Sequence, residues 1–242
     1  IAEITDMDVI FVIGSNTTET HPVIATKMRQ AAKKGAVIIV AEPRRIELCN
    51  DAQFFLQIKP GTNVALLNGM LKAILEAGLE NKNFINERTE GFNELKAYLD
   101  TVTVEECAEI CRVEAALLRK AAETYARAKN AGIFYAMGIT QHSTGTDGVR
   151  MVANLAMLCG QIGKEASGVN PLRGQNNVQG SCDMAALPGD LPGYQKVADP
   201  KAREKFSKAW GLPVPETAGK TVSEIFNAID DGEIKFLYIM GE

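Results

Sequence analysis

A single arginine stands in a stretch of the chain with no other lysine or arginine, and its neighbours suit ligand binding. Arg173 is the only such residue between Lys164 and Lys196, within the run Gly168-Val-Asn-Pro-Leu-Arg-Gly-Gln-Asn-Asn-Val-Gln-Gly180. The glycine after it lets the backbone approach a ligand, and the amides that follow can donate and accept hydrogen bonds. A guanidinium in this setting suits bidentate capture of a small carboxylate or a phosphate. An arginine that ties a loop to carbonyl oxygens would show the same pattern.

Two polar segments follow predicted strands and could hold a nucleotide. The first, Gly14-Ser-Asn-Thr-Thr-Glu-Thr-His-Pro22, precedes a helical pattern, where backbone N–H groups and the helix dipole favour an anion such as phosphate. It lacks the G-x-G-x-x-G spacing of dinucleotide sites, so a capping loop fits equally well. The second, Glu42-Pro-Arg44, lies where α/β nucleotide sites place a carboxylate on a ribose diol and an arginine near a phosphate or base. Such a turn is also commonplace on protein surfaces.

The histidines and cysteines offer little catalytic chemistry by themselves. His21 and His142 both fall in predicted strand-to-helix loops, where a histidine could transfer a proton near neutral pH or simply form hydrogen bonds. The five cysteines are odd in number and none are spaced C-x-x-C, so neither a disulfide framework nor a zinc ribbon is indicated. Cys107 and Cys111 lie four residues apart in a predicted helix. Two thiols that face the core explain this spacing better than two ligands of one metal ion. We therefore predict reduced, mostly buried cysteines and no metal-ligating residues.

The elements that position these loops alternate between strand and helix patterns. The run Asp8-Val-Ile-Phe-Val-Ile13 is continuously apolar, as in a strand that is buried on both faces of a parallel sheet. A helix from Pro22 to Lys34 and a second strand from Ala36 to Ala41 complete a βαβ unit, which places the loops 14–21 and 42–51 on one carboxyl edge. Further along we predict a strand at 54–58, a helix at 64–77, mixed helices at 83–129, a strand at 133–136, a polar loop at 138–145 and a helix at 146–161.

These patterns predict an α/β fold with a doubly wound, mostly parallel, Rossmann-like sheet, followed by part of a second α/β domain. Residues 163–195 hold six glycines and three prolines without a helix or strand period, so we predict an ordered loop that lines a ligand site. Helices at 199–210 and 222–230 and a strand at 234–240 follow, and Met240-Gly-Glu242 is similar to another strand-to-loop switch. The predicted boundaries are 1–165, 166–195 and 196–242.

The composition argues against several classes of protein. The chain has 242 residues, 30 acidic and 26 basic side chains, a formal net charge of −4 and a sequence pI near 5.4, without the clustered basic residues of a nucleic-acid binder. No stretch approaches the ~18 consecutive apolar residues that span a bilayer. With 46% apolar and 23% charged residues, the chain resembles folded globular proteins. We expect no nucleic-acid partner, no membrane span and no disorder. The chain has no initiator methionine, and we therefore predict that it is a piece of a longer protein.

Several of these segments form a combined pattern over essentially the whole chain. Its motifs are Ile13-Gly-Ser-Asn16 with Glu19 and His21-Pro22, Glu42-Pro-Arg44, Pro60-Gly-Thr-Asn63, Met137-Gly-Ile-Thr-Gln-His142, and Gly168 to Met184 with Leu187-Pro188 and Pro192-Gly-Tyr194. With these motifs the sequence resembles the catalytic (alpha) subunit of molybdenum- or tungsten-dependent formate dehydrogenases, within the larger group of molybdopterin oxidoreductases. The long loop around Arg173 is the most specific part, because it separates formate dehydrogenases from nitrate and dimethyl sulfoxide reductases.

The resemblance implies an enzyme that carries a bis(molybdopterin guanine dinucleotide) cofactor with molybdenum or tungsten and a 4Fe-4S cluster. It would oxidise formate to carbon dioxide and pass two electrons to electron-transfer subunits or to an external acceptor. In such enzymes the cluster cysteines and the cysteine or selenocysteine that ligates the metal precede the segment matching Ile1, so we expect this chain alone to be inactive. Residues 1–165 would bind one guanine dinucleotide, and residues 166–195 would line the active site and a pterin. The enzyme is expected in the cytoplasm, or in the periplasm if the parent carries an export signal.

The resemblance also implies roles for single residues. Arg173 matches the arginine that faces the metal and orients formate, whereas the family's active-site histidine lies upstream, so His21 and His142 do not inherit its role. Glu42 stands where the family has aspartate more often, but the longer glutamate side chain still reaches a ribose diol. The positions that match loops holding one guanine dinucleotide are Asn16, Glu19, Glu42, Arg44, Gly61 and Asn63. The positions that match residues bordering a pterin are Met137, Gln141, Gly174 and Gln175.

Other functions stay open at the level of the sequence. Another molybdopterin oxidoreductase could act on a different small oxyanion. A nucleotide-binding module without redox chemistry would keep the loops 14–22 and 42–44 and would not need the loop 168–184. A purely structural domain would need none of these loops.

Overall fold

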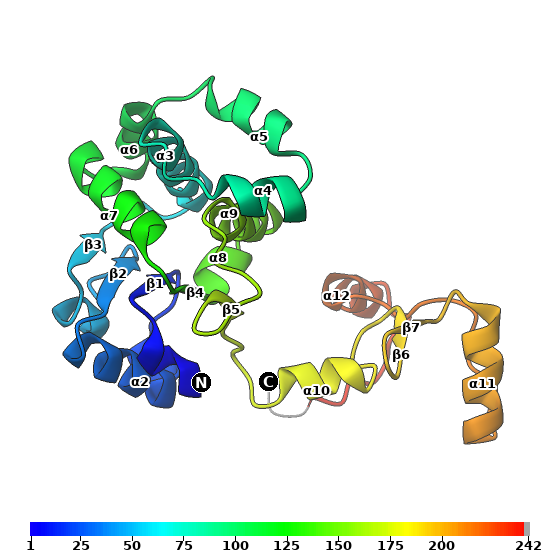
Figure 1. The fold of residues 1–242 in the computed structure, drawn as a ribbon. Coiled ribbons are helices and arrows are strands. Elements are labelled where there is room, and N and C mark those ends of the chain that lie inside the picture. The colour runs from blue at the N-terminus through cyan, green and yellow to red at the C-terminus, as the bar shows by residue number, and fades with distance from the viewer. Residues whose placement is uncertain (240–242) are drawn as a thin grey trace. The chain divides into compact units, whose positions relative to one another are not determined.

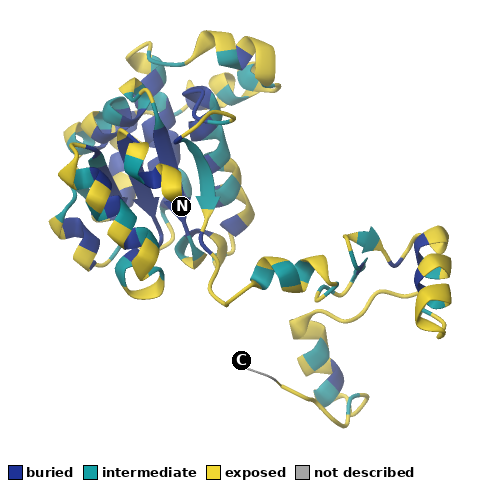
Figure 2. Cartoon of the chain, turned by 60° about the horizontal axis from the view of Figure 1, so that its bottom comes forward, coloured by how far each residue is buried: buried dark blue, intermediate teal, exposed yellow. Residues whose placement is uncertain are grey.

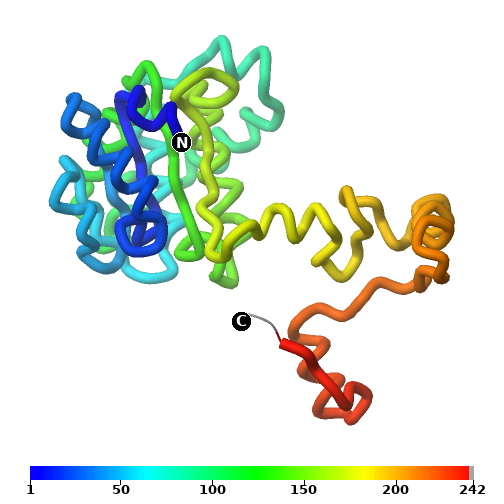
Figure 3. The backbone as a smooth tube through the Cα atoms, turned by 90° about the horizontal axis from the view of Figure 1, so that it is seen from below, coloured from blue at the N-terminus to red at the C-terminus, as the bar shows by residue number. Residues whose placement is uncertain are grey.

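The computed structural model describes residues 1–239 and divides the chain into two compact units, Ile1–Gly174 and Gln175–Glu242. The tube in Figure 3 follows the chain from the blue N-terminus through the first unit and into the second, whose colours run from yellow to red. Within residues 1–239, every helix is too short or too polar to cross a lipid bilayer.

The first unit is built around a parallel sheet of five strands in the order β3-β2-β1-β4-β5 (Figure 1). The strands are β1 (Val9–Ile13), β2 (Val37–Ala41), β3 (Phe54–Leu56), β4 (Ala131–Tyr135) and β5 (Gly168–Pro171). Every residue of β1 and β4 is buried, which explains why these segments are continuous apolar runs instead of alternating ones. The predicted doubly wound α/β fold is confirmed.

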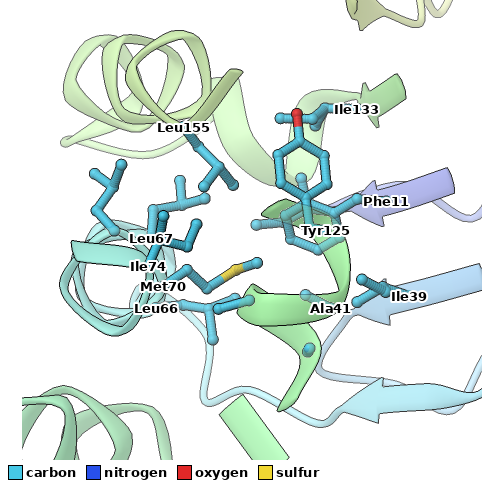
Figure 4. Packing of buried hydrophobic residues seen from close by; sticks show 14 of the residues in the cluster. Phe11, Ile39, Ala41, Leu66, Leu67, Met70, Ile74, Tyr125, Ile133 and Leu155 are labelled. Carbon is cyan, nitrogen blue, oxygen red and sulfur yellow. The ribbon is translucent and has the colours of Figure 1, made fainter. Parts of the chain in front are cut away.

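Helices cover both faces of this sheet. On one face, Phe11, Ile39 and Ile133 pack in a large core with α3 (Asn63–Glu76), α7 (Ala115–Arg127) and α9 (Gly145–Leu158), and α6 (Val104–Cys111) packs against α3 and α7 (Figure 4). On the other face, Ile10 and Ile38 pack against α2 (Pro22–Lys33). Successive strand residues point to opposite faces, so β1, β2, β3 and β4 each contribute to both cores. The unit also contains η1 (Ala2–Asp6), η2 (Glu47–Asn50), α1 (Thr17–Thr20), α4 (Lys82–Arg88), α5 (Phe92–Leu99) and α8 (Met137–Thr140).

The second unit has a small core and short elements. It contains α10 (Val178–Asp183), β6 (Asp190–Leu191), β7 (Gln195–Lys196), α11 (Pro200–Trp210) and α12 (Val222–Asp230), and β6 pairs with β7 in antiparallel orientation. Its buried apolar cluster consists of Leu191, Val197, Ala202 and Phe206. Figure 2 shows that most of this unit is exposed or of intermediate exposure. The helices are held by local capping: Asp199 accepts the Lys201 N–H at the start of α11, and Thr221 forms a capping box with Glu224 at α12.

Two expectations about regular structure were wrong. The segment 163–195 is not free of helices and strands, because it contains β5, α10, β6 and β7. The strand predicted from 234 is absent over residues 234–239, and Met240-Gly-Glu242 lies outside the described residues. A strand forms where a neighbouring strand offers hydrogen-bond partners, and β5 finds them at the edge of β4, despite its low strand propensity. The described part of the chain offers no such partner to residues 234–239.

Candidate functional site

Two glycines meet where the sheet reverses its winding. From β1 the chain passes outward to β2 and β3, and β4 then lies on the other side of β1. Ligands of open α/β sheets bind at such switch points, outside the carboxyl ends of the strands. Gly14 directly follows β1 with φ +60°, and the Gly138 N–H donates to its carbonyl oxygen at 3.0 Å. A Cβ atom on Gly14 would lie 2.6 Å from the Gly138 carbonyl carbon, so this approach of the two loops requires glycine.

Asn63 fixes the same backbone from a third element. It is the first residue of α3 and is buried, and its Nδ2 donates to the carbonyl oxygen of Gly138 at 3.0 Å. Before it, the turn is closed by the Thr62 hydroxyl, which donates to the Lys59 carbonyl oxygen at 2.6 Å, and Gly61 adopts φ +83° within that turn. The amide of Asn63 thus holds the loop after β4, which carries Met137 and Gln141.

The polar loop that the sequence predicts after β1 contains one helical turn. The Asn16 carbonyl oxygen accepts the N–H groups of Glu19 and Thr20 at 3.2 and 3.0 Å, and the Asn16 Oδ1 accepts the Thr18 hydroxyl at 3.1 Å. These bonds form α1, whose Thr17 is buried. Glu19 is exposed on this turn, and Asn16 is half-buried. The turn places an amide and a carboxylate at the carboxyl edge of the sheet.

Arg173 is exposed and lies two residues beyond the end of β5. The Leu172 N–H donates to the Tyr135 carbonyl oxygen at 2.7 Å, which extends the pairing of β5 with β4 to the residue before Arg173. The Arg173 carbonyl oxygen lies 2.6 Å from Nε2 of His21, at the end of the β1 loop. Burial raises the pKa of the Tyr135 hydroxyl, and the positive charge of Arg173 acts in the opposite direction. The backbone is therefore held by strand β4 at Leu172 and by the loop after β1 at Arg173.

The loop after β2 carries a buried carboxylate next to an exposed arginine. Glu42 is 8% exposed, and its N–H donates to the Leu56 carbonyl oxygen at 3.2 Å. Burial raises the pKa of the Glu42 carboxyl, while a hydrogen bond from the Arg44 backbone and the charge of Arg44 lower it. Gln57 Nε2 donates to the Pro43 carbonyl oxygen at 3.0 Å and holds the turn. A carboxylate fixed in this way can accept hydroxyl hydrogens of a ligand that lies along the edge of β1 and β2.

The structure brings together the predicted residues of the β1, β4 and β5 loops and of the start of α3. A Cβ atom on Gly174 would lie 3.5 Å from the Met137 side chain, so these two positions are also close. Gln175 begins the second unit and takes no part in the contacts described above. His142 is half-buried between α8 and α9, where its carbonyl oxygen accepts the Gly145 N–H at 2.9 Å. The predicted residues with exposed positions are Glu19, Arg44, Gly61, Met137, Gln141, Arg173, Gly174 and Gln175.

Sequence reasoning missed the glycine pair and the contact of His21. A glycine after a buried strand is a sequence signal for both Gly14 and Gly138. No sequence signal joins His21 to Arg173, because they are 152 residues apart, or Asn63 to Gly138, which are 75 residues apart.

The cysteines agree with the prediction of reduced thiols: Cys49, Cys107, Cys111 and Cys159 are free and buried, and Cys182 is free and half-buried. Among the described residues, no cluster of acidic, histidine or cysteine side chains could hold a metal ion.

Comparison with known proteins gives one consistent result. The family model described as molybdopterin oxidoreductase matches residues 1–242. The F420-dependent formate dehydrogenase subunit alpha of Methanocaldococcus jannaschii is 49% identical over 97% of the chain, and formate dehydrogenase H of Escherichia coli is 46% identical over 100%. The chain spans 34% of the length of each of these two relatives. Among solved structures, acetylene hydratase from Pelobacter acetylenicus matches with a TM-score of 0.64 and 28% identity, over 67% of this chain and 23% of that one.

Proposed function

Because the chain belongs to the molybdopterin oxidoreductase family, we propose that it is the central part of the catalytic subunit of a molybdenum- or tungsten-dependent formate dehydrogenase. The reaction would be HCOO⁻ → CO₂ + H⁺ + 2 e⁻, with the electrons passed to electron-transfer subunits or to an external acceptor. The observation that supports this most is the position of Arg173. An exposed guanidinium at the carboxyl edge of the sheet suits a small carboxylate, and its backbone is held by the β1 loop at Arg173 and by strand β4 at Leu172.

The residues of the carboxyl edge fit a large cofactor with a nucleotide part. The close approach of Gly14 and Gly138 keeps side chains away from the switch point, and Asn16, Glu19 and Glu42 offer amide and carboxylate groups there. We assign Asn16, Glu19, Glu42, Arg44, Gly61 and Asn63 to one guanine dinucleotide of a bis(molybdopterin guanine dinucleotide) cofactor. We assign Met137, Gln141, Gly174 and Gln175 to the border of a pterin. When bound, this cofactor supplies the two-electron redox chemistry.

The chain's own part in the reaction is to bind and orient the substrate. The Arg173 guanidinium would pair with both oxygens of formate, offset its charge and fix the direction of the C–H bond. Asn63 and the two glycines would keep the β4 loop in place beside it. A 4Fe-4S cluster and the amino-acid ligand of the metal would come from parts of the protein outside this chain.

The test is metal analysis together with formate-dependent reduction of viologen dye by the full-length protein, expressed in a host that makes the pterin cofactor. About one molybdenum or tungsten per chain with formate-dependent dye reduction is the expected result. Metal without formate oxidation would keep the cofactor assignment and move the substrate to another small oxyanion. Protein without metal would leave only a nucleotide-binding module, which a guanine nucleotide should stabilise against heat.

A further inference from the structure

We infer that His21 is a positioning residue for Arg173: it holds the arginine's backbone carbonyl and thereby sets the direction from which the guanidinium meets an anionic ligand. The inference rests on the proposed function only for the identity of that anion, formate. The observation behind it is the distance of 2.6 Å between His21 Nε2 and the Arg173 carbonyl oxygen. This bond joins the loop after β1 to the segment after β5.

The protons of this contact can be assigned from the hydrogen-bonding groups. A carbonyl oxygen only accepts, so Nε2 must carry the hydrogen. Nδ1 lies 2.8 Å from the Thr20 hydroxyl oxygen, which also lies 2.9 Å from the Asn16 carbonyl oxygen. The hydroxyl can donate to Nδ1 when the imidazole is neutral, or to Asn16 when Nδ1 is protonated. Nε2 carries a hydrogen in both arrangements, so both keep its bond to the Arg173 carbonyl oxygen.

The bond matters because it adds a second fixed point to the backbone around Arg173. On the N-terminal side of Arg173, the Leu172 N–H is fixed to Tyr135 in β4. On the C-terminal side, the carbonyl bond from His21 is followed by Gly174, the last residue of the first unit. With both sides held, the Cα–Cβ bond of Arg173 has a fixed direction, and less conformational freedom is lost when the long side chain binds a ligand.

The same geometry argues against a role of His21 in proton transfer. Both ring nitrogens are engaged by atoms of the protein, Nδ1 by Thr20 and Nε2 by the Arg173 carbonyl. His21 is also the residue before α2, but its side chain makes no capping hydrogen bond to that helix. Removal of the imidazole should therefore leave α2 intact and act on the Arg173 segment.

The experiment compares His21→Ala, His21→Gln and Thr26→Ala in the full-length protein. Glutamine keeps an N–H donor near the position of Nε2. Thr26→Ala is the matched control, because it removes a side-chain hydrogen bond to a backbone carbonyl within α2 and has no part in the Arg173 segment. Amide hydrogen exchange of residues 172–174 is measured without substrate, and KM and kcat for formate are measured on preparations with equal metal content.

We expect His21→Ala to speed amide exchange of residues 172–174 by about fivefold or more and to raise the KM for formate about tenfold, with a smaller change in kcat. His21→Gln should recover most of both effects, and Thr26→Ala should change neither. Unchanged exchange in His21→Ala would overturn the inference, and so would faster exchange with an unchanged KM. If the wild-type protein does not oxidise formate, the proposed function fails, and the exchange rate still decides whether His21 holds the segment.

Discussion

Arg173 carries the charge that the proposed reaction requires, and its planar group distinguishes it from lysine. A guanidinium offers two parallel N–H bonds to a carboxylate, whereas an ammonium acts as a point charge. We expect Arg173→Lys to raise the KM for formate and lower kcat, with a loss of at least tenfold in kcat/KM, or about 1.4 kcal/mol. Steady-state kinetics of the full-length enzyme at equal metal content measure this loss.

The matched control for that substitution is Arg150→Lys. Arg150 is also exposed, but it lies on α9, where its guanidinium meets Asp147 at 3.5 Å. This variant should keep kcat/KM within about twofold, because exposed ion pairs contribute little. If Arg173→Lys also stays within twofold, Arg173 does not clamp the substrate.

Gly138 is the residue whose size decides whether the β1 and β4 loops can meet. A Cβ atom on it would lie 2.6 Å from the Cα atom of Gly14, and backbone atoms cannot move aside as a flexible side chain can. We expect Gly138→Ala to destabilise the protein by about 1–3 kcal/mol and to lower the content of bound cofactor. Thermal unfolding and metal analysis are the measurements.

A suitable control is Gly189→Ala. A Cβ atom on Gly189 would have nothing within 4 Å, so this substitution should leave both the melting temperature and the metal content unchanged. Equal behaviour of the two variants would show that the glycine contact does not shape the site.

At the scale of elements, the start of α4 joins two helices and can be tested separately from the site. Asn81 Oδ1 accepts the Phe84 N–H at 3.0 Å, and the Asn81 N–H donates to the Leu158 carbonyl oxygen at the end of α9. Asn81→Ala should cost about 1 kcal/mol of stability, because the cap of α4 is lost and the backbone bond to α9 is not. Chemical denaturation measures the difference.

Asn83 provides the comparison within the same helix. It is exposed inside α4, where alanine is the better helix former, so Asn83→Ala should be neutral or slightly stabilising. Neither variant should alter the KM for formate, since α4 takes no part in the contacts of the carboxyl edge. A similar loss of stability in both variants would contradict the assignment of Asn81 as the cap.

At the scale of the molecule, the two units differ in how much apolar surface they bury. The first has a sheet with a core on each face, whereas the buried cluster of the second consists of Leu191, Val197, Ala202 and Phe206. Small cores do not offset the conformational entropy of their chain. We expect a fragment of residues 1–174 to unfold cooperatively, with a melting temperature within about 5 °C of that of residues 1–242.

Residues 175–242 alone should show no cooperative transition in the same calorimetric scan. A sharp transition of that fragment would show that its small core suffices. A loss of cooperativity in residues 1–174 would show that the first unit depends on the second.

The sequence by itself determined the architecture of the first unit and the edge at which its polar loops lie. Continuous apolar runs such as 9–13 predict strands that are buried on both faces, and such strands need helices on both sides. The resemblance of the loop around Arg173 to one family then indicated the chemistry. Both signals are local in the chain, because hydrophobic periodicity and short motifs do not depend on distant partners.

Only the tertiary structure decided which residues meet at that edge. The bonds from His21 to Arg173 and from Asn63 to Gly138 join segments that are distant in the chain, so no local pattern encodes them. The same reason explains the failures over regular structure: Gly168–Pro171 becomes a strand because β4 offers it an edge, and 234–239 does not because no strand in residues 1–239 pairs with it. Whether a segment forms a strand, and which residues form a site, both depend on contacts between segments that are distant in the chain. Those contacts are set by the tertiary fold.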